Sequence, residues 1–124
     1  MKHILIGCLT LFLSVNSFAY NFIGVYKCKG YDPYLKRNYS GTVTIAAQNT
    51  VYKITMDYDT GEKYKATGGP YSTNLLSVVF QDINKPDHVG LEQYTLSEDE
   101  KKMGGFWVYL GKDKLGEEIC EKLS

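Results

Sequence analysis

The fold is decided by residues 50–69, which read TVYKITMDYDTGEKYKATGG. Over residues 50–58, large side chains that suit a core (Tyr52, Ile54, Met56 and Tyr58) alternate with polar ones (Lys53, Thr55 and Asp57). Successive side chains of a β-strand point to opposite faces, so this alternation predicts a strand with one buried and one solvated face. The triplet Asp59-Thr60-Gly61 is typical of a hairpin turn, and the alternation resumes with Tyr64 and Ala66. We therefore predict an antiparallel hairpin formed by residues 50–58 and 62–69.

The rest of the chain repeats this pattern. Polar turns and loops separate eight candidate strands, at about residues 21–29, 39–47, 50–58, 62–69, 74–81, 88–97, 103–110 and 115–122. No connection between them is long enough to hold a crossover helix between parallel strands. The sequence therefore predicts an all-β fold, a single eight-stranded antiparallel up-and-down β-barrel. Because the number of strands is even, the eighth strand can run antiparallel to the first and close the barrel.

The N-terminal segment has the features of a signal peptide. An almost wholly apolar run, Ile4 to Phe12, follows a short polar start, and Ser17-Phe18-Ala19 offers small residues for cleavage. We expect a signal peptide over residues 1–19, a barrel domain over residues 20–124, and an exported protein that is periplasmic or secreted. The apolar run is too short for a membrane span, so no transmembrane segment is expected. Lipid attachment at Cys8 is an alternative, but the apolar run continues past that cysteine.

Two cysteines, Cys28 and Cys120, remain after the signal peptide is removed. In an exported protein such a pair predicts a disulfide. The bridge would close a loop of about 93 residues, which corresponds to about 4 to 5 kcal/mol of chain-entropy stabilisation. It would join the first and eighth strands near the seam of the barrel. A structural role is favoured over redox chemistry because no Cys-x-x-Cys spacing occurs.

Charge and motifs exclude several classes of function. The chain has 14 basic and 14 acidic side chains, so it carries no basic footprint for nucleic acid or for an anionic membrane. No nucleophile elbow, zinc-binding helix or phosphate-binding glycine loop occurs. His88 is the one histidine of residues 20–124 and has no ligand-forming residues at metal-site spacing. We expect no catalytic residues, no metal and no cofactor, and therefore a protein that is not an enzyme.

Aromatic side chains point to binding. Tyr26, Tyr52, Tyr64 and Trp107 are expected in the barrel interior. An eight-stranded barrel is either filled by its side chains or holds one small ligand, and large aromatic residues favour the filled core.

Loops supply a second candidate site. In an up-and-down barrel the loops after strands one, three, five and seven gather at one rim. The predicted rim carries Tyr31, Tyr34, Lys36, Arg37, Asp59, His88 and Lys112. Exposed tyrosines beside basic side chains suit a recognition surface, although ordinary solvated loops would have the same composition. The leading hypothesis is a non-enzymatic protein that binds a small apolar or aromatic ligand, or a protein partner, through this rim.

Two families of barrel proteins share short motifs with the chain. The stretches GVYKCKGYDP (24–33), YSGTVTI (39–45) and GFW (105–107) resemble small exported bacterial proteins with an avidin-like or lipocalin-like barrel. That resemblance covers nearly all of residues 20–124, and it implies a fold more than a chemistry.

The second resemblance is to periplasmic inhibitors of C-type lysozyme. Tyr26-Lys27-Cys28, Cys120 and the stretch TGGPY (67–71) are similar to motifs of that family. It implies an inhibitory loop with Thr67, Gly68 and Tyr71, in which the Thr67 hydroxyl would engage the lysozyme's catalytic carboxylates; a plain hairpin turn is the alternative. A structural or adhesive component of the cell envelope is a third hypothesis.

Overall fold

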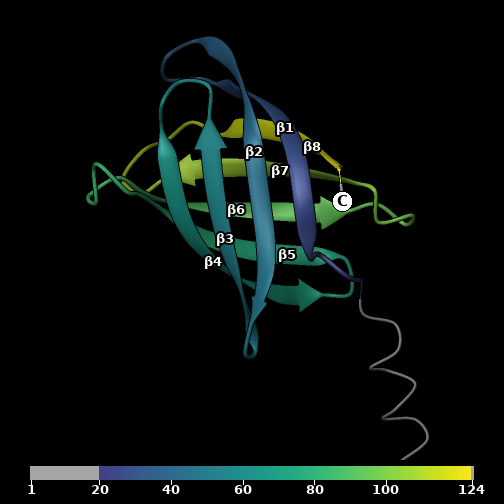
Figure 1. Ribbon diagram of the computed structural model, residues 1–124. Helices are drawn as coiled ribbons and strands as arrows, with labels where there is room; N and C mark the ends of the chain where they lie inside the picture. Colours follow the sequence, from purple (N-terminus) through teal and green to yellow (C-terminus); the bar gives the residue numbers. More distant parts are fainter. Residues whose placement is uncertain (1–19, 124) are drawn as a thin grey trace, which may run out of the picture.

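The computed structural model describes residues 20–123 and shows a closed barrel of eight antiparallel strands (Figure 1). The strands are β1 (Gly24–Asp32), β2 (Arg37–Gln48), β3 (Val51–Tyr58), β4 (Lys63–Ser72), β5 (Leu75–Asp82), β6 (Val89–Leu96), β7 (Lys102–Tyr109) and β8 (Gly116–Lys122). The predicted fold class is confirmed. The predicted signal peptide, residues 1–19, lies outside the described residues.

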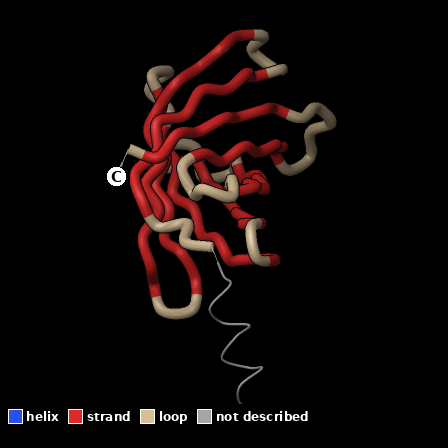
Figure 2. The backbone as a smooth tube through the Cα atoms, turned by 90° about the vertical axis from the view of Figure 1, so that its right-hand side faces the viewer, coloured by secondary structure: helices blue, strands red, loops and turns tan. Residues whose placement is uncertain are grey.

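Each strand pairs with its neighbours in sequence, and β1 also pairs with β8. In Figure 1, β1 to β3 cross the front of the barrel, β5 to β8 cross behind them, and β4 curves from one layer to the other. Short loops make all the connections between the strands (Figure 2). Over the described residues, no helix is long and apolar enough to cross a membrane.

The seam of the barrel is held by the predicted disulfide. Cys28 and Cys120 are direct partners in the pairing of β1 with β8, with their Cα atoms 4.0 Å apart and an S–S bond of 2.01 Å. Neither residue is exposed to solvent. The bridge therefore lies inside the barrel and closes it, as the cysteine pair predicted.

The fourth strand is longer than predicted. Pairing with β5 continues through Gly69–Ser77 and Pro70–Leu76 and shifts register before Ser72–Leu75. Proline lacks a backbone N–H and is tolerated in sheets mainly at edges and bulges, which is where Pro70 lies. The expected turn at residues 70–73 was therefore wrong, and the strands connect through Thr73 and Asn74.

The interior of the barrel has two chemically different halves. The half toward the β2–β3, β4–β5 and β6–β7 turns is called the apolar half. It contains Phe22, Tyr26, Val43, Ile45, Ile54, Leu76, Val78, Leu96 and Met103. The half toward the β1–β2, β3–β4, β5–β6 and β7–β8 loops is called the tyrosine–carboxyl half. It contains Tyr39, Tyr58, Tyr64, Phe80, Glu92, Tyr94, Trp107, Tyr109 and Glu118. The disulfide lies between the two.

Candidate functional site

Glycines position the aromatic rings of the tyrosine–carboxyl half. Five aromatic residues face a glycine directly across the sheet, in the pairs Gly30–Tyr39, Gly41–Tyr58, Gly90–Phe80, Gly105–Tyr94 and Gly116–Trp107. At each of these glycines an added Cβ would overlap the opposing ring. The missing side chain lets the ring lie across the neighbouring strand, an arrangement that pins strand register. The rings therefore lie against the wall of the barrel, and the hydroxyls of Tyr39, Tyr58 and Tyr94 reach one carboxyl group.

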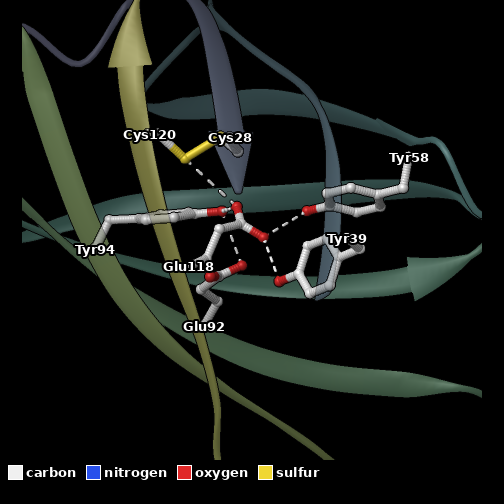
Figure 3. Close-up of a disulfide and its surroundings, with 7 residues drawn as sticks. All are labelled: Cys28, Tyr39, Tyr58, Glu92, Tyr94, Glu118 and Cys120. Atoms are coloured by element: carbon white, nitrogen blue, oxygen red, sulfur yellow. Dashed lines mark hydrogen bonds between the residues drawn. A yellow bond between two sulfur atoms is a disulfide. The ribbon is translucent and has the colours of Figure 1, made fainter. Parts of the chain in front are cut away.

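The central polar group is Glu118 on β8. Its Oε2 accepts hydrogen bonds from the hydroxyls of Tyr39 (2.8 Å) and Tyr58 (2.9 Å), and its Oε1 lies 2.7 Å from the hydroxyl of Tyr94 (Figure 3). The same Oε1 lies 3.5 Å from the sulfur of Cys120. Only 1 % of the residue is exposed, so the three tyrosine hydroxyls take the place of water around the carboxylate.

Glu92 on β6 is the partner of Glu118. The hydroxyl of Tyr94 lies 2.8 Å from Oε1 of Glu92 as well as 2.7 Å from Glu118. A tyrosine hydroxyl has a single proton, so one of the two carboxyls must donate to Tyr94 rather than accept from it. Two further hydroxyls already donate to Glu118, which makes Glu118 the charged acceptor. Glu92 is then a neutral acid that donates through Oε1.

The electrostatics support this assignment. Burial raises the pKa of Glu92 well above its ordinary value, and the nearby charge of Glu118 raises it further. Burial also raises the pKa of Glu118, but three tyrosine hydroxyls oppose that rise by donating to its charged form. Glu118 therefore ionises first, and the pair holds one proton between two carboxyls.

The surrounding tyrosines remain neutral. Burial and the charge of Glu118 raise the pKa of Tyr39, Tyr58 and Tyr94 well above the ordinary tyrosine value. Burial raises the pKa of Tyr109, nearer the loops, to about 12. These hydroxyls act as hydrogen-bond donors and acceptors and do not supply charge.

A cavity of about 30 Å³ opens among these residues. It extends from Glu92 and Glu118 to Thr60 and Glu62 in the β3–β4 turn, and the rings of the tyrosine–carboxyl half line its wall. A single water needs about 10 to 15 Å³ of such space, so two or three water-sized groups fit. From the aromatic content we expected side chains to fill the barrel interior. Because this cavity lies in the tyrosine–carboxyl half, the expectation holds only for the apolar half.

Two buried polar atoms of the cavity wall have no hydrogen-bond partner among residues 20–123. They are Oε2 of Glu92 and the indole N–H of Trp107, and these residues are only 4 % and 6 % exposed. Leaving a buried polar group unpaired costs about 1 to 3 kcal/mol. The wall of the cavity thus contains one acceptor and one donor without partners, which is typical of a site that takes up a polar molecule.

The cavity does not have the geometry of a site for a divalent ion. Within residues 20–123, the one group of three potential ligand atoms within 4.8 Å of one another is Cys28, Glu118 and Cys120. Both sulfurs belong to the disulfide and cannot ligate as thiolates. The carboxyls of the cavity are spread along its wall rather than gathered around one point.

The structure places two of the predicted rim residues against the cavity wall. Tyr34 and His88 each contact the ring of Tyr109, which lines the cavity, at centroid distances of 6.1 Å and 5.9 Å. The hydroxyl of Tyr34 also donates to the backbone carbonyl of Lys114 and accepts from its N–H, both at 2.8 Å. The β1–β2 and β7–β8 loops are thereby joined beside the opening.

The other rim residues do not converge on the cavity. Tyr31, Lys36, Arg37, Asp59 and Lys112 are exposed and do not line it. Tyr31 lies instead in a groove on the outer face of the barrel beside Lys29 and Glu117. Asp59 accepts hydrogen bonds from the backbone N–H and the hydroxyl of Ser40, which fixes the turn after β3.

All four aromatic residues expected in the interior lie on inward-facing positions. Tyr26, Tyr64 and Trp107 are buried. Tyr52 is half-buried and packs edge-on against Phe22 in the apolar half. Only Tyr64 and Trp107 belong to the cavity wall.

The expected inhibitory loop is not a loop. Thr67 and Gly68 lie inside β4, paired with Val79 and Val78 of β5. Gly68 is buried, and an added Cβ there would crowd Ile54. Tyr71 is 75 % exposed and lies where the register of β4 shifts. Residues 67–71 form a strand because the pairing of β4 with β5 satisfies the backbone of Gly69 and extends beyond it.

Sequence reasoning missed the carboxyl pair, although a signal for it was present. Glu118 stands two residues before Cys120, and residues two apart in a strand share a face. A cysteine that bridges the barrel interior therefore places Glu118 inside. Glu92 likewise shares a face with Tyr94 and Leu96.

Comparison with protein-family models and with curated proteins finds no match for this chain.

Proposed function

We propose that this chain is a small, non-enzymatic binding protein that takes up a small polar molecule in the cavity of its tyrosine–carboxyl half. The observation that carries the proposal is the pair of unpartnered buried atoms, Glu92 Oε2 and Trp107 Nε1, in the wall of one cavity. A bound molecule with matching groups would satisfy both. The ligand expected from the aromatic content was apolar or aromatic, and the carboxyl pair favours a polar one instead.

The proposed role does not include catalysis. The carboxyl pair is enclosed by tyrosine hydroxyls, and the cavity holds only two or three water-sized groups, so a substrate bond and an attacking water would not fit together beside it. We also propose that the protein acts outside the cytoplasm. The signal-peptide-like N-terminus predicts export, and an internal disulfide persists in an oxidising compartment.

The single tryptophan makes the proposal testable by NMR. Trp107 gives one indole N–H resonance, and its N–H is the unpartnered donor in the cavity. A library of fragments with four or fewer heavy atoms, in cationic, neutral and anionic sets, is titrated into ¹⁵N-labelled protein. Binding in the cavity shifts the indole resonance and leaves the amides of Leu76 and Leu96 in the apolar half unmoved. If no fragment moves the indole resonance, the proposal is wrong.

Inhibition of C-type lysozyme is supported less well by the geometry. Thr67 faces outward from a regular strand, and only Tyr71 of the stretch protrudes strongly. Titration of C-type lysozyme with the purified protein tests this second role directly, since an inhibitor would abolish hydrolysis at equimolar protein.

A further inference from the structure

The cavity has the composition of a site for a small cation. Four carboxyl residues line it, Asp32, Glu62, Glu92 and Glu118, and among residues 20–123 no lysine, arginine or histidine does so. Aromatic rings make up most of the remaining wall, and the faces of such rings attract cations. We infer that the ligand of this site is the primary ammonium group of a small amine, an inference that rests on the proposed function.

The negative charge of the site is not neutralised by a basic group of the cavity wall. Glu118 is the charged member of the carboxyl pair, and the donors around it are neutral tyrosine hydroxyls. Near the opening, Glu62 accepts hydrogen bonds from the hydroxyls of Thr60 and Tyr64, and within residues 20–123 from no basic side chain. A cation that leaves water must meet opposite charge in its site, and this cavity supplies it.

The hydrogen-bonding pattern selects an ammonium group with N–H donors. Oε2 of Glu92 has no hydrogen-bond donor. The other oxygen of this carboxyl, Oε1, makes the contact with Tyr94, so a ligand can bind to Oε2 without breaking that contact. A primary ammonium has three donors and can fill this position. It has no acceptor for the unpartnered N–H of Trp107, so the natural amine would carry an acceptor elsewhere in the molecule, and ethylammonium tests the ammonium half of the site alone. A quaternary ammonium has none, and its four carbon substituents exceed the two or three water-sized groups that fit.

Three probes of nearly equal size separate charge from shape: ethylammonium, ethanol and acetate, each at constant chloride and pH 7. Ethylammonium is expected to shift the Trp107 indole resonance with a dissociation constant on the order of 1 mM, as befits three heavy atoms. Ethanol, acetate and tetramethylammonium are expected to bind at least tenfold more weakly. Equal or tighter binding of ethanol or acetate overturns the inference and leaves the proposed function standing. If these four probes leave the indole resonance unmoved but a library fragment shifts it, the ammonium inference alone fails.

A pair of matched variants tests the acceptor. Glu92→Met removes Oε2 at nearly constant volume and leaves Tyr94 bonded to Glu118. Glu117→Met is the control, because Glu117 is the exposed neighbour of Glu118 on the outer face of β8. We expect Glu92→Met to weaken ethylammonium binding at least tenfold and Glu117→Met to leave it unchanged. Undiminished binding in a folded Glu92→Met protein would contradict the inference.

Discussion

The two halves of the barrel interior are built from the same strands but follow opposite rules. In the apolar half, side chains such as Ile54 and Leu76 are fully buried and present no polar group to be satisfied. In the tyrosine–carboxyl half, Glu92 and Glu118 are equally well buried, yet each must be solvated by protein groups. The first half stabilises the barrel by removing apolar surface from water. The second removes ionisable groups from bulk water, which costs stability, and the proposed ligand site would account for that cost.

The difference suggests a physical reason why a small barrel could hold the proposed site and still keep its fold. The disulfide lies between the halves and is fully buried, so the seam does not depend on the polar groups beside it. Perturbing each region separately should therefore give effects of different size, sign and pH dependence.

The largest effect is expected from the boundary between the halves. Replacement of Cys28 and Cys120 together by alanine should lower the free energy of unfolding by about 4 to 5 kcal/mol, because the unfolded chain regains the entropy of a long loop. Denaturant unfolding measures it. The control is Lys29→Ala with Ile119→Ala, an outward-facing pair directly opposite each other on the same two strands. A cysteine-free variant within about 1 kcal/mol of the parent would show that the closed barrel does not depend on the bridge.

A smaller effect is expected from the apolar half. Leu76→Ala should cost about 2 to 5 kcal/mol, because it removes a fully buried side chain and leaves a void. The cost should be the same at pH 4 and pH 8, since no ionisable group is involved. Leu91→Ala, at a position on the outer face of β6 that is 59 % exposed, is the control and should change stability by less than about 0.5 kcal/mol. A loss for Leu76→Ala that varies with pH would mean that the two halves are coupled.

The smallest effect, with the opposite sign, is expected from the tyrosine–carboxyl half. Burial raises the pKa of Glu92 in the folded state, so the folded protein holds a proton that the unfolded chain releases. The resulting loss of folding stability is absent below the ordinary carboxyl pKa, and it grows as the pH rises toward the raised pKa of Glu92 in the folded state. Glu92→Gln removes it, so this variant should be more stable than the parent at pH 8 by about 1 kcal/mol or more, or about 4 to 8 °C in Tm, with little difference at pH 4.

Thermal unfolding at both pH values measures this change, and Glu117→Gln on the outer face is the matched control. A stabilisation of equal size at pH 4 and pH 8 would contradict the assignment of Glu92 as the protonated member of the pair.

Local patterns predicted the fold well and the site poorly. Alternation in residues 50–58 indicated a strand, because side-chain alternation is a property of a single strand. Cys28 and Cys120 indicated the seam, because they are the two cysteines left after the signal peptide. The predicted turn at residues 70–73 was wrong, since continued pairing with β5 through Pro70 and Ser72 outweighed the local turn preference. The predicted rim consisted of seven polar and aromatic residues, of which Tyr34 and His88 pack against an aromatic ring of the cavity wall.

The sequence by itself determined the strands, the antiparallel order and the pairing of the cysteines, since these follow from side-chain period, turn chemistry and an even strand count. The tertiary structure alone decided that Glu92 and Glu118 share one tyrosine hydroxyl, and that an unpaired acceptor and an unpaired indole N–H belong to the wall of one cavity. The reason is distance along the chain: each of the eight strands contributes one or two side chains to the cavity, and only closure of the barrel brings them together.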